Sequence, residues 1–125
     1  MNLPSTSIKR LEGVHPDLVK VVKRAAELTD VPFIVTEGLR TLARQKQLVA
    51  AGASKTMKSR HLNGHAVDLA VVLNGKLSWD WPLYHKLAKI VKQAAAEVKV
   101  PIEWGGDWKS FKDGVHFQLP WSIYK

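Results

Sequence analysis

The sequence predicts one α+β domain over residues 1–125, with a small antiparallel sheet and flanking helices. Three observations lead to this expectation. Apolar residues recur at helical spacing in several stretches, short β-branched segments alternate with those stretches, and the gaps between segments after residue 65 suit hairpins better than βαβ crossovers. A chain of 125 residues is also long enough for a single hydrophobic core and no separate second module.

The first half of the chain is expected to hold two helices with a strand between them. Residues 15–30 form the first helix, and Pro16 suits its first turn. Residues 31–38 predict a short strand closed by a glycine, and Thr41 can cap a second helix over residues 42–52. The faces that repeat at helical spacing contain Leu18, Val21 or Val22, Ala25 and Leu28 in the first helix, and Leu42, Gln45 and Leu48 or Val49 in the second.

Three strands are expected in the second half. Residues 66–73 are β-branched and apolar, which favours a strand. The Asn-Gly pair at residues 74–75 then predicts a tight turn into a short edge segment. Residues 102–104 and 115–119 complete the set of strands.

The longest helix is predicted between these strands. It begins near Asp80 or Pro82, runs to about Lys99, and is ended by Pro101. Its apolar stripe contains Leu83, Leu87, Ile90, Val91, Ala94 and Val98.

Composition restricts the chemistry of any site. The absence of cysteine excludes disulfides and thiolate metal ligands, so a metal ion would be held by histidine and carboxylate side chains. The formal charge of +8, from 19 Lys and Arg against 11 Asp and Glu, indicates an anionic partner. Nucleic acid, a membrane surface and a bacterial envelope all qualify, and charge alone does not choose among them.

The chain shows no apolar run near the roughly 18 residues that cross a bilayer. Its N-terminus also lacks a charged head followed by an apolar segment. We therefore expect no transmembrane segment and no secretion signal, and synthesis in the cytoplasm.

Period-two alternation predicts a polar side of the sheet. In residues 66–73, Asp68 shares one face with two alanines, while Val67, Leu69 and Val71 share the apolar face. In the last strand His116 and Gln118 point away from the apolar set in the same manner. His61 lies just before an Asn-Gly corner that could fold its imidazole over Asp68.

Two imidazoles, one carboxylate and an open fourth position match a catalytic zinc shell. Two other interpretations remain open on spacing alone. His61 and His65 have the i, i+4 spacing of a metal-binding helix, although Asn63-Gly64 disfavours a helix there. The polar residues could also be half-buried groups that satisfy one another without a metal.

Several motifs, in order along roughly residues 14 to 119, resemble one family. The signature SxHxxGxAxD is matched by Ser59, His61, Gly64, Ala66 and Asp68. The other motifs are Gly38-Leu39-Arg40-Thr41 followed by Gln45, Trp104-Gly105-Gly106-Asp107-Trp108, and Asp113-Gly114-Val115-His116. Together they resemble the VanY-like D-alanyl-D-alanine carboxypeptidase group of zinc peptidases. The short length and the opening Val-His-Pro-Asp-Leu are most similar to its phage endolysin branch of L-alanyl-D-glutamate endopeptidases.

The resemblance implies a role for each matched residue. His61, Asp68 and His116 would ligate one Zn²⁺ ion. Asp113 would be the general base, although many family members have glutamate there and an aromatic residue before the histidine. Asp107 is the rival, either as the base or as a residue that holds a ligand imidazole.

The remaining implied contacts concern the substrate. Arg40 would contact the substrate or the oxyanion, and its alternative is a surface salt bridge with Glu37 or another carboxylate. Ser59 would hydrogen-bond the substrate or a loop. Trp104 and Trp108 would line a cleft for the peptide stem, unless they are core residues.

The implied function is a zinc-dependent peptidoglycan peptidase of the endolysin type, which cleaves the L-alanyl-D-glutamate bond of the cell-wall stem peptide. We expect a monomer that acts at the wall after another protein has permeabilised the membrane. The alternatives are a D,D-carboxypeptidase or dipeptidase on D-Ala-D-Ala precursors, and a domain that binds metal without catalysis. A nucleic-acid-binding domain is the interpretation from another class, but no RNA motif or reading helix supports it.

Overall fold

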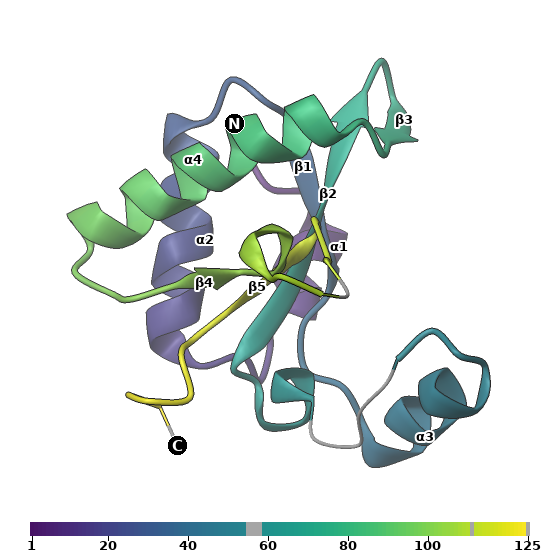
Figure 1. Cartoon of the computed structure of the whole chain (residues 1–125). Coiled ribbons are helices and arrows are strands. Elements are labelled where there is room, and N and C mark those ends of the chain that lie inside the picture. Colours follow the sequence, from purple (N-terminus) through teal and green to yellow (C-terminus); the bar gives the residue numbers. More distant parts are fainter. Residues whose placement is uncertain (55–58, 111, 125) are drawn as a thin grey trace.

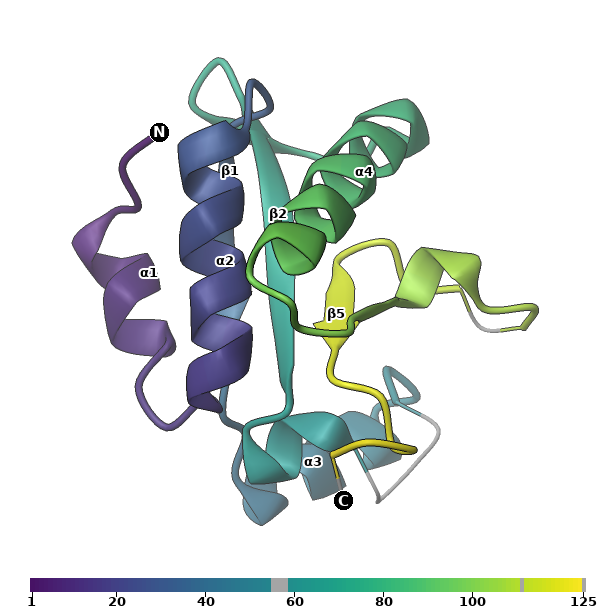
Figure 2. The same ribbon diagram turned by 90° about the vertical axis from the view of Figure 1, so that its left-hand side faces the viewer.

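The computed structural model describes residues 1–54, 59–110 and 112–124 and arranges them as a sheet with two long helices over one face. These helices are α2 (Pro16–Leu28) and α4 (Trp81–Glu97). Figure 1 shows both on one side of the sheet, and Figure 2 looks onto that side. The opposite face of the sheet is therefore left for other elements.

The described strands form one five-stranded antiparallel sheet, which confirms the predicted fold class. Its order is β1-β2-β5-β4, and β3 pairs with the far end of β2. The strands are β1 (Phe33–Glu37), β2 (Ala66–Leu73), β3 (Lys76–Ser78), β4 (Glu103–Trp104) and β5 (His116–Gln118). The predicted turn between β2 and β3 is also present, with positive φ at both Asn74 and Gly75.

The hydrophobic core lies between this sheet and the two helices. Val67, Leu69 and Val71 are 0% exposed and belong to the core cluster, so the predicted apolar face of β2 is confirmed. Most residues of the apolar stripes predicted for α2 and α4 are buried as well. At the edge of the core, four of them are only partly buried, namely Leu28, Leu83, Ile90 and Val98. An ion pair between Arg24 and Glu97, 2.7 Å long, joins α2 to α4 at the surface.

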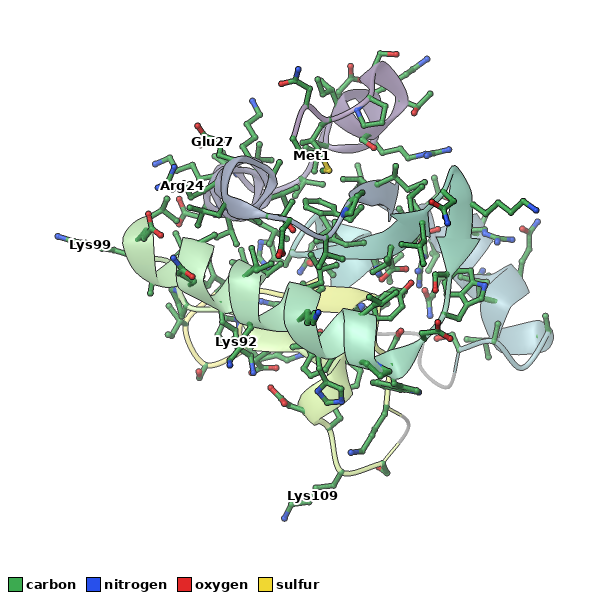
Figure 3. The ribbon with its side chains drawn as sticks, turned by 90° about the horizontal axis from the view of Figure 1, so that it is seen from above. Met1, Arg24, Glu27, Lys92, Lys99 and Lys109 are labelled. Atoms are coloured by element: carbon green, nitrogen blue, oxygen red, sulfur yellow. The ribbon has the colours of Figure 1, made fainter. Side chains whose placement is uncertain are left out.

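Figure 3, a view from above, shows the charged ends of this helical layer. Arg24 and Glu27 lie on α2, whereas Lys99 extends into solvent beyond the end of α4. The helix ends at Glu97, two residues before the predicted end, because Lys99 has a φ of 60° and leaves the helical conformation. Within the described residues, no helix combines the length and apolar content that crossing a bilayer requires.

The structure adds a short helix, α1 (Ser5–Arg10), that the sequence pattern does not predict. Its first turn has no side-chain cap, so the sequence carries little local signal for it. Ser7 is fully buried, and its Oγ accepts a hydrogen bond of 3.0 Å from the backbone N–H of Val35. Because β1 ends the strand order, this contact satisfies a backbone group that no further strand pairs.

Helix α3 (Leu42–Ala50) forms as predicted, with Thr41 Oγ1 accepting from the Arg44 N–H at 3.1 Å. It lies on the other side of the sheet from α2, away from the two-helix layer (Figure 1). Of its predicted face only Gln45 is buried, and Leu42 remains 53% exposed. The helical spacing in α3 therefore does not mark a core face.

Candidate metal centre and its cleft

Two neighbouring strands place the carboxylate and one imidazole of the candidate centre. Asp68 on β2 is the register partner of His116 on β5, and both lie on the face opposite the helices. The residues on either side of Asp68 on this face, Ala66 and Ala70, are small and fully buried. The predicted polar side of the sheet is therefore present, with room above the carboxylate.

The second imidazole comes from a turn just before β2. His61 lies in the 3-10 helix η1 (Arg60–Asn63), where the Oγ of Ser59 accepts from the His61 N–H at 3.2 Å. Gly64 ends this turn with a φ of 73°. A Cβ at Gly64 would lie 2.3 Å from the carbonyl oxygen of Gly13, so glycine is required for both the backbone angle and the close approach.

His61, Asp68 and His116 meet as a cluster. His61 Nε2 lies 3.2 Å from Asp68 Oδ1, and His116 Nδ1 lies 3.4 Å from the same oxygen. One possible ligand atom from each residue falls within 4.8 Å of the other two. Both imidazoles are buried, and 18% of the Asp68 side chain is exposed.

The hydrogen bonds of the two imidazoles indicate whether a cation fits between them. In each ring, the outer nitrogen, which faces away from Asp68, lies beside an acceptor. His61 Nδ1 lies 2.8 Å from the carbonyl oxygen of Gly38, and His116 Nε2 lies 2.7 Å from Oε1 of Gln118. Neither oxygen has a proton, so both outer nitrogens must donate. In the neutral rings, the two inner nitrogens then present lone pairs toward a carboxylate. Three converging lone-pair donors suit a divalent metal ion.

The pKa shifts of Asp68 and His116 also indicate that the cluster favours a positive charge. Burial alone would raise the pKa of Asp68, but hydrogen bonds from His116 and His61 outweigh it and hold that pKa well below its usual range. Burial opposes the charged form of His116, yet the hydrogen bond and charge of Asp68 raise its pKa. The raised pKa of His116 means that positive charge is favoured beside Asp68, and in the absence of a metal ion a proton can supply it. A metal ion bound by the two imidazoles and the carboxylate would take the place of that proton.

Glu103 and Gln118 form a hydrogen-bonded chain that ends at His116. The Nε2 of Gln118 donates to Oε2 of Glu103 at 3.1 Å, which orients the amide so that its oxygen faces His116. The two residues are register partners on β5 and β4. The carboxylate on one edge strand thereby determines the orientation of an imidazole on the next strand.

We expect Gln118→Leu to weaken binding of added Zn²⁺ by about 10- to 100-fold, because His116 loses the acceptor that orients it. Leucine is of similar size and suits a buried position, so the fold should persist. Competition against a chromophoric chelator measures the affinity, and Gln93→Leu on α4 provides a matched control at an exposed glutamine. Equal affinities of the two variants would show that the amide does not orient the ligand.

The loop that carries Asp113 packs against the Trp104–Trp108 motif. The backbone N–H of Asp113 donates to the Gly105 carbonyl at 3.0 Å, and Trp104 Nε1 donates to the Gly114 carbonyl at 2.8 Å. Burial, and then the negative charge of Asp68, raise the pKa of Asp113. Asp113 therefore lies close enough to the cluster for the charge of Asp68 to act on it, and it lines the same cleft.

Arg40 is held in a network beside Asp68. Its guanidinium forms an ion pair with Glu37, donates to Gln45 Oε1 at 2.7 Å, and has Nη2 4.0 Å from Asp68 Oδ2. The side chain is only 10% exposed, so the predicted alternative of a salt bridge with Glu37 is present, but at the site rather than on the open surface. A guanidinium held in this way can stabilise negative charge near the cluster.

A cleft of about 820 Å³ lies over the cluster. It contains the three cluster residues together with Arg40, Ser59, Trp108 and Asp113, so the structure brings these predicted site residues together. The ring of Trp108 lies 5.2 Å from that of His116. Ser59 lies 3.5 Å from Arg40 and also caps the turn that holds His61.

The structure places Trp104 outside the cleft, which corrects the expectation of a substrate contact. Its side chain is 3% exposed, and its ring stacks on Phe117 within the core. The strand alternation explains this, because Trp104 pairs with Phe117 in the apolar register of β4 and β5. Its contribution to the site is the hydrogen bond to Gly114.

Asp107 and His65 also lie away from the cluster. Asp107 is exposed and forms an ion pair of 2.6 Å with Lys92, which Figure 3 shows on α4. The residues that hold the imidazoles are Gly38 and Gln118 instead of Asp107. His65 has opposite strand parity to Asp68, and its ring contacts His15 and Tyr124.

The sequence analysis assigned no role at the site to several residues of the cleft, among them Glu103, Gln118, Arg60 and Trp121. Gln118 had a usable signal, because it follows His116 by two residues and therefore shares its face of the strand. The other three come from separate elements. Only the tertiary structure places them at the cleft.

The antiparallel sheet and the open cleft over the buried cluster form a fold that this chain shares with a D,D-dipeptidase. The homologues described below show that the chain is a small peptidase. The chain belongs to the phage L-alanyl-D-glutamate peptidase family, whose sequence model matches residues 1–117. This confirms the resemblance seen in the motifs.

Individual relatives agree with this assignment. The L-alanyl-D-glutamate peptidase of Escherichia phage T5 is 37% identical over 111 residues, which are 86% of this chain and 81% of that protein. The crystal structure of the Serratia marcescens L-Ala D-Glu endopeptidase ChiX is 48% identical, with a TM-score of 0.93 over 99% of this chain and 93% of that one. The vancomycin-resistance D,D-dipeptidase VanXYg matches at 15% identity and a TM-score of 0.53, covering 85% of this chain and 50% of that one, and this shows the fold alone.

Proposed function

We propose that this chain is a zinc-dependent endopeptidase that hydrolyses the L-alanyl-D-glutamate bond of the bacterial cell-wall stem peptide. The convergence of His61, Asp68 and His116 in a cleft is the observation that carries the proposal. The phage T5 and Serratia relatives are named for cleavage of this bond, which supports the choice of bond.

The donor set supports zinc as the ion. Two imidazole nitrogens and one carboxylate oxygen suit Zn²⁺, and hard cations such as Mg²⁺ prefer oxygen ligands alone. When bound, zinc would polarise the scissile carbonyl and make a water molecule a stronger nucleophile near neutral pH.

Asp113 would move the proton. Its carboxylate accepts a proton from the attacking water, whose oxygen forms a bond to the alanyl carbonyl carbon. The carbon–nitrogen bond then breaks, and the carboxyl group of Asp113 returns the proton to the amine of D-glutamate. The raised pKa of Asp113 favours both steps, because it makes the carboxylate a better base and the carboxyl a donor at moderate pH.

Arg40 would stabilise the negative charge that develops on the carbonyl oxygen. Glu37 and Gln45 hold the guanidinium in place before the substrate binds, so little reorganisation is needed. Trp108 and Ser59 line the cleft and would contact the peptide.

The position of the loop that carries Asp113 can be tested by a substitution that leaves every charged group intact. An added Cβ at Gly105 would lie 2.4 Å from the Asp113 carbonyl oxygen, so Gly105→Ala must displace the loop. We expect hydrolysis to fall about 100-fold, the cost of a misplacement near 1 Å. Gly114→Ala is the milder control, because its methyl group would meet no backbone atom and would lie 3.3 Å from the Trp81 ring and 3.6 Å from the Tyr84 ring. Similar rates for Gly105→Ala and the wild type would contradict this role of the glycine.

Digestion of purified peptidoglycan, followed by mass spectrometry, tests the proposed reaction. We expect new D-glutamate amines, loss of the reaction in chelator, and its return with zinc. Released D-alanine would instead support the D,D-carboxypeptidase alternative. Zinc binding without any cleavage would support a metal-binding domain that lacks catalysis.

Access to the wall belongs to the same proposal. The net charge of +8 would concentrate the protein on an anionic envelope. We propose that it is made in the cytoplasm of the host, reaches the wall after membrane permeabilisation, and acts as a monomer.

A further inference from the structure

The cleft has two chemically different ends on either side of the metal cluster. The sheet order β1-β2-β5-β4 puts Glu37 and Arg40 on one side of Asp68 and His116, and Glu103 on the other. Helix α3 and the C-terminal segment also lie on different sides of η1 (Figure 1). A substrate that spans the cluster therefore meets different groups at its two ends.

The end beside the C-terminal segment contains an exposed indole ring. Trp121 lines the cleft and is 50% exposed. The guanidinium carbon of Arg60 lies 4.0 Å from the centroid of the Trp121 ring, so one face of the indole is covered by Arg60. This contact holds the ring in place and leaves the rest of it for a ligand.

Arg60 itself has unused hydrogen-bonding capacity at this end. It is 2% exposed, and its guanidinium donates to the carbonyl oxygens of Leu119 and Tyr124. Its Nη1 is buried and has no hydrogen-bond partner among the residues that the structure describes. A buried donor without a partner is costly, and Arg60 is one of the residues that line the cleft. Glu103 at the same end supplies carboxylate oxygens as acceptors.

The opposite end, beside α3, has another character. None of the described residues that line it is aromatic, and these residues are Glu37, Arg40, Arg44, Leu48, Ala53 and Ser54. Arg44 is exposed there, and Arg40 lies nearby on the same side. This end suits carboxylates and not a flat ring with hydroxyl groups.

The proposed substrate has two matching halves. On one side of the scissile bond, L-alanine is joined through a short acyl link to a sugar of the glycan strand. On the other side, D-glutamate and the rest of the stem carry carboxylates. The sugar begins roughly 7 Å from the scissile carbonyl, since each residue spans about 3.5 Å. A cleft that receives the bond must therefore also receive or exclude the sugar.

We propose that Trp121 and Arg60 form a subsite for the sugar of the glycan strand, which directs the stem peptide toward α3. The inference rests on the proposed function and adds a substrate orientation to it. A sugar ring would stack on the indole, while Arg60 Nη1 donates to a sugar or acyl oxygen and Glu103 accepts from a hydroxyl group. The family match ends at residue 117, so Trp121 lies beyond the part of the chain that the match covers.

Two soluble substrates test this subsite. One is the tripeptide L-alanyl-γ-D-glutamyl-diaminopimelate linked to the N-acetylglucosaminyl-N-acetylmuramyl disaccharide, and the other is the same tripeptide with an acetyl group in place of the sugars. We expect Trp121→Ala to lower kcat/KM about tenfold on the sugar-linked substrate and to leave the acetylated peptide unchanged. Trp121→Phe should fall between the wild type and Trp121→Ala, because it keeps a smaller ring.

Trp79→Ala provides the matched control, because Trp79 is 63% exposed and is not among the residues that line the cleft. It should cleave both substrates at the wild-type rate. Equal losses on both substrates for Trp121→Ala would overturn the proposal, since they would indicate a peptide contact or a structural role. Unchanged rates on both substrates would overturn it as well.

A binding measurement separates this inference from the proposed reaction. N-acetylmuramyl-L-alanine is titrated into chelator-treated protein, and the tryptophan emission is followed. We expect a saturable change in the wild type that is absent in Trp121→Ala. Its absence in the wild type would overturn the subsite even if the bond is cleaved. Binding without any hydrolysis would retain the subsite and contradict the proposed reaction.

Discussion

Asp68→Asn is expected to abolish both zinc binding and peptidase activity. The substitution preserves the shape of the side chain but removes the only negative charge of the proposed ligand set. Zinc affinity should fall by more than the roughly 100-fold that loss of a supporting residue can cost. Metal content by mass spectrometry and the wall digestion above measure the two effects.

The same variant also tests the metal-free cluster. The pKa of Asp68 is lowered on folding, so its contribution to stability is present above its unfolded pKa of about 3.9 and is lost as pH falls through the folded value. The pKa of His116 is raised, so its contribution is present below about 6.5 and is lost as pH rises. Metal-free Asp68→Asn should therefore be least stable relative to the wild type between about pH 4 and 6.5.

His65→Gln is the control for this prediction, because His65 is a neighbouring histidine outside the cluster. It should retain zinc. Zinc lost from His65→Gln but kept by Asp68→Asn would reverse the proposed ligand assignment and return to the His61–His65 interpretation of the sequence.

Asp113→Asn is expected to lower the rate of hydrolysis by about 10²- to 10⁴-fold while zinc remains bound, because general acid–base catalysis contributes this much. Asparagine preserves the size of the side chain and cannot accept the proton. Asp107→Asn is the matched control at the rival aspartate, whose exposed pair with Lys92 lies outside the cleft. Loss of activity in Asp107→Asn and not in Asp113→Asn would exchange the two assignments.

Removal of the Asp113 charge should also stabilise the metal-free protein at neutral pH. Its pKa is raised on folding, so the folded state binds the proton more tightly than the unfolded chain does. That contribution is present below the unfolded pKa and is lost as pH rises through the folded value. Asparagine stays uncharged at every pH, so the variant does not lose this contribution to stability at pH 7. The Tm of chelator-treated Asp113→Asn should therefore exceed that of the wild type at pH 7. A lower Tm would contradict the burial of this carboxyl.

Much of the fold could be predicted from local patterns. The alternation in residues 66–73 identified both the core face of β2 and the polar face that carries Asp68, because a strand exposes alternate side chains to opposite sides. Helix α3 shows the limit of such patterns. Its spacing was correct, but nothing local indicated that it lies away from the core layer.

The site could be predicted for the residues that occur in specific motifs. Trp104 was harder, because an aromatic residue before a glycine pair fits both a cleft and a core, and the register with Phe117 decided for the core. Arg60 and Trp121 were missed because their contact joins η1 to the C-terminal segment. No sequence period links two such distant positions.

The sequence by itself determined the residue types that can hold a cation, the strands that carry two of them, and the glycine that ends the turn carrying the third. These follow from side-chain chemistry and backbone angles, which act over a few residues. Tertiary structure alone decided which groups orient the imidazoles, which aspartate lies beside the cluster, and what lines each end of the cleft. Those outcomes depend on strand register and on packing between distant segments, and a local pattern contains neither.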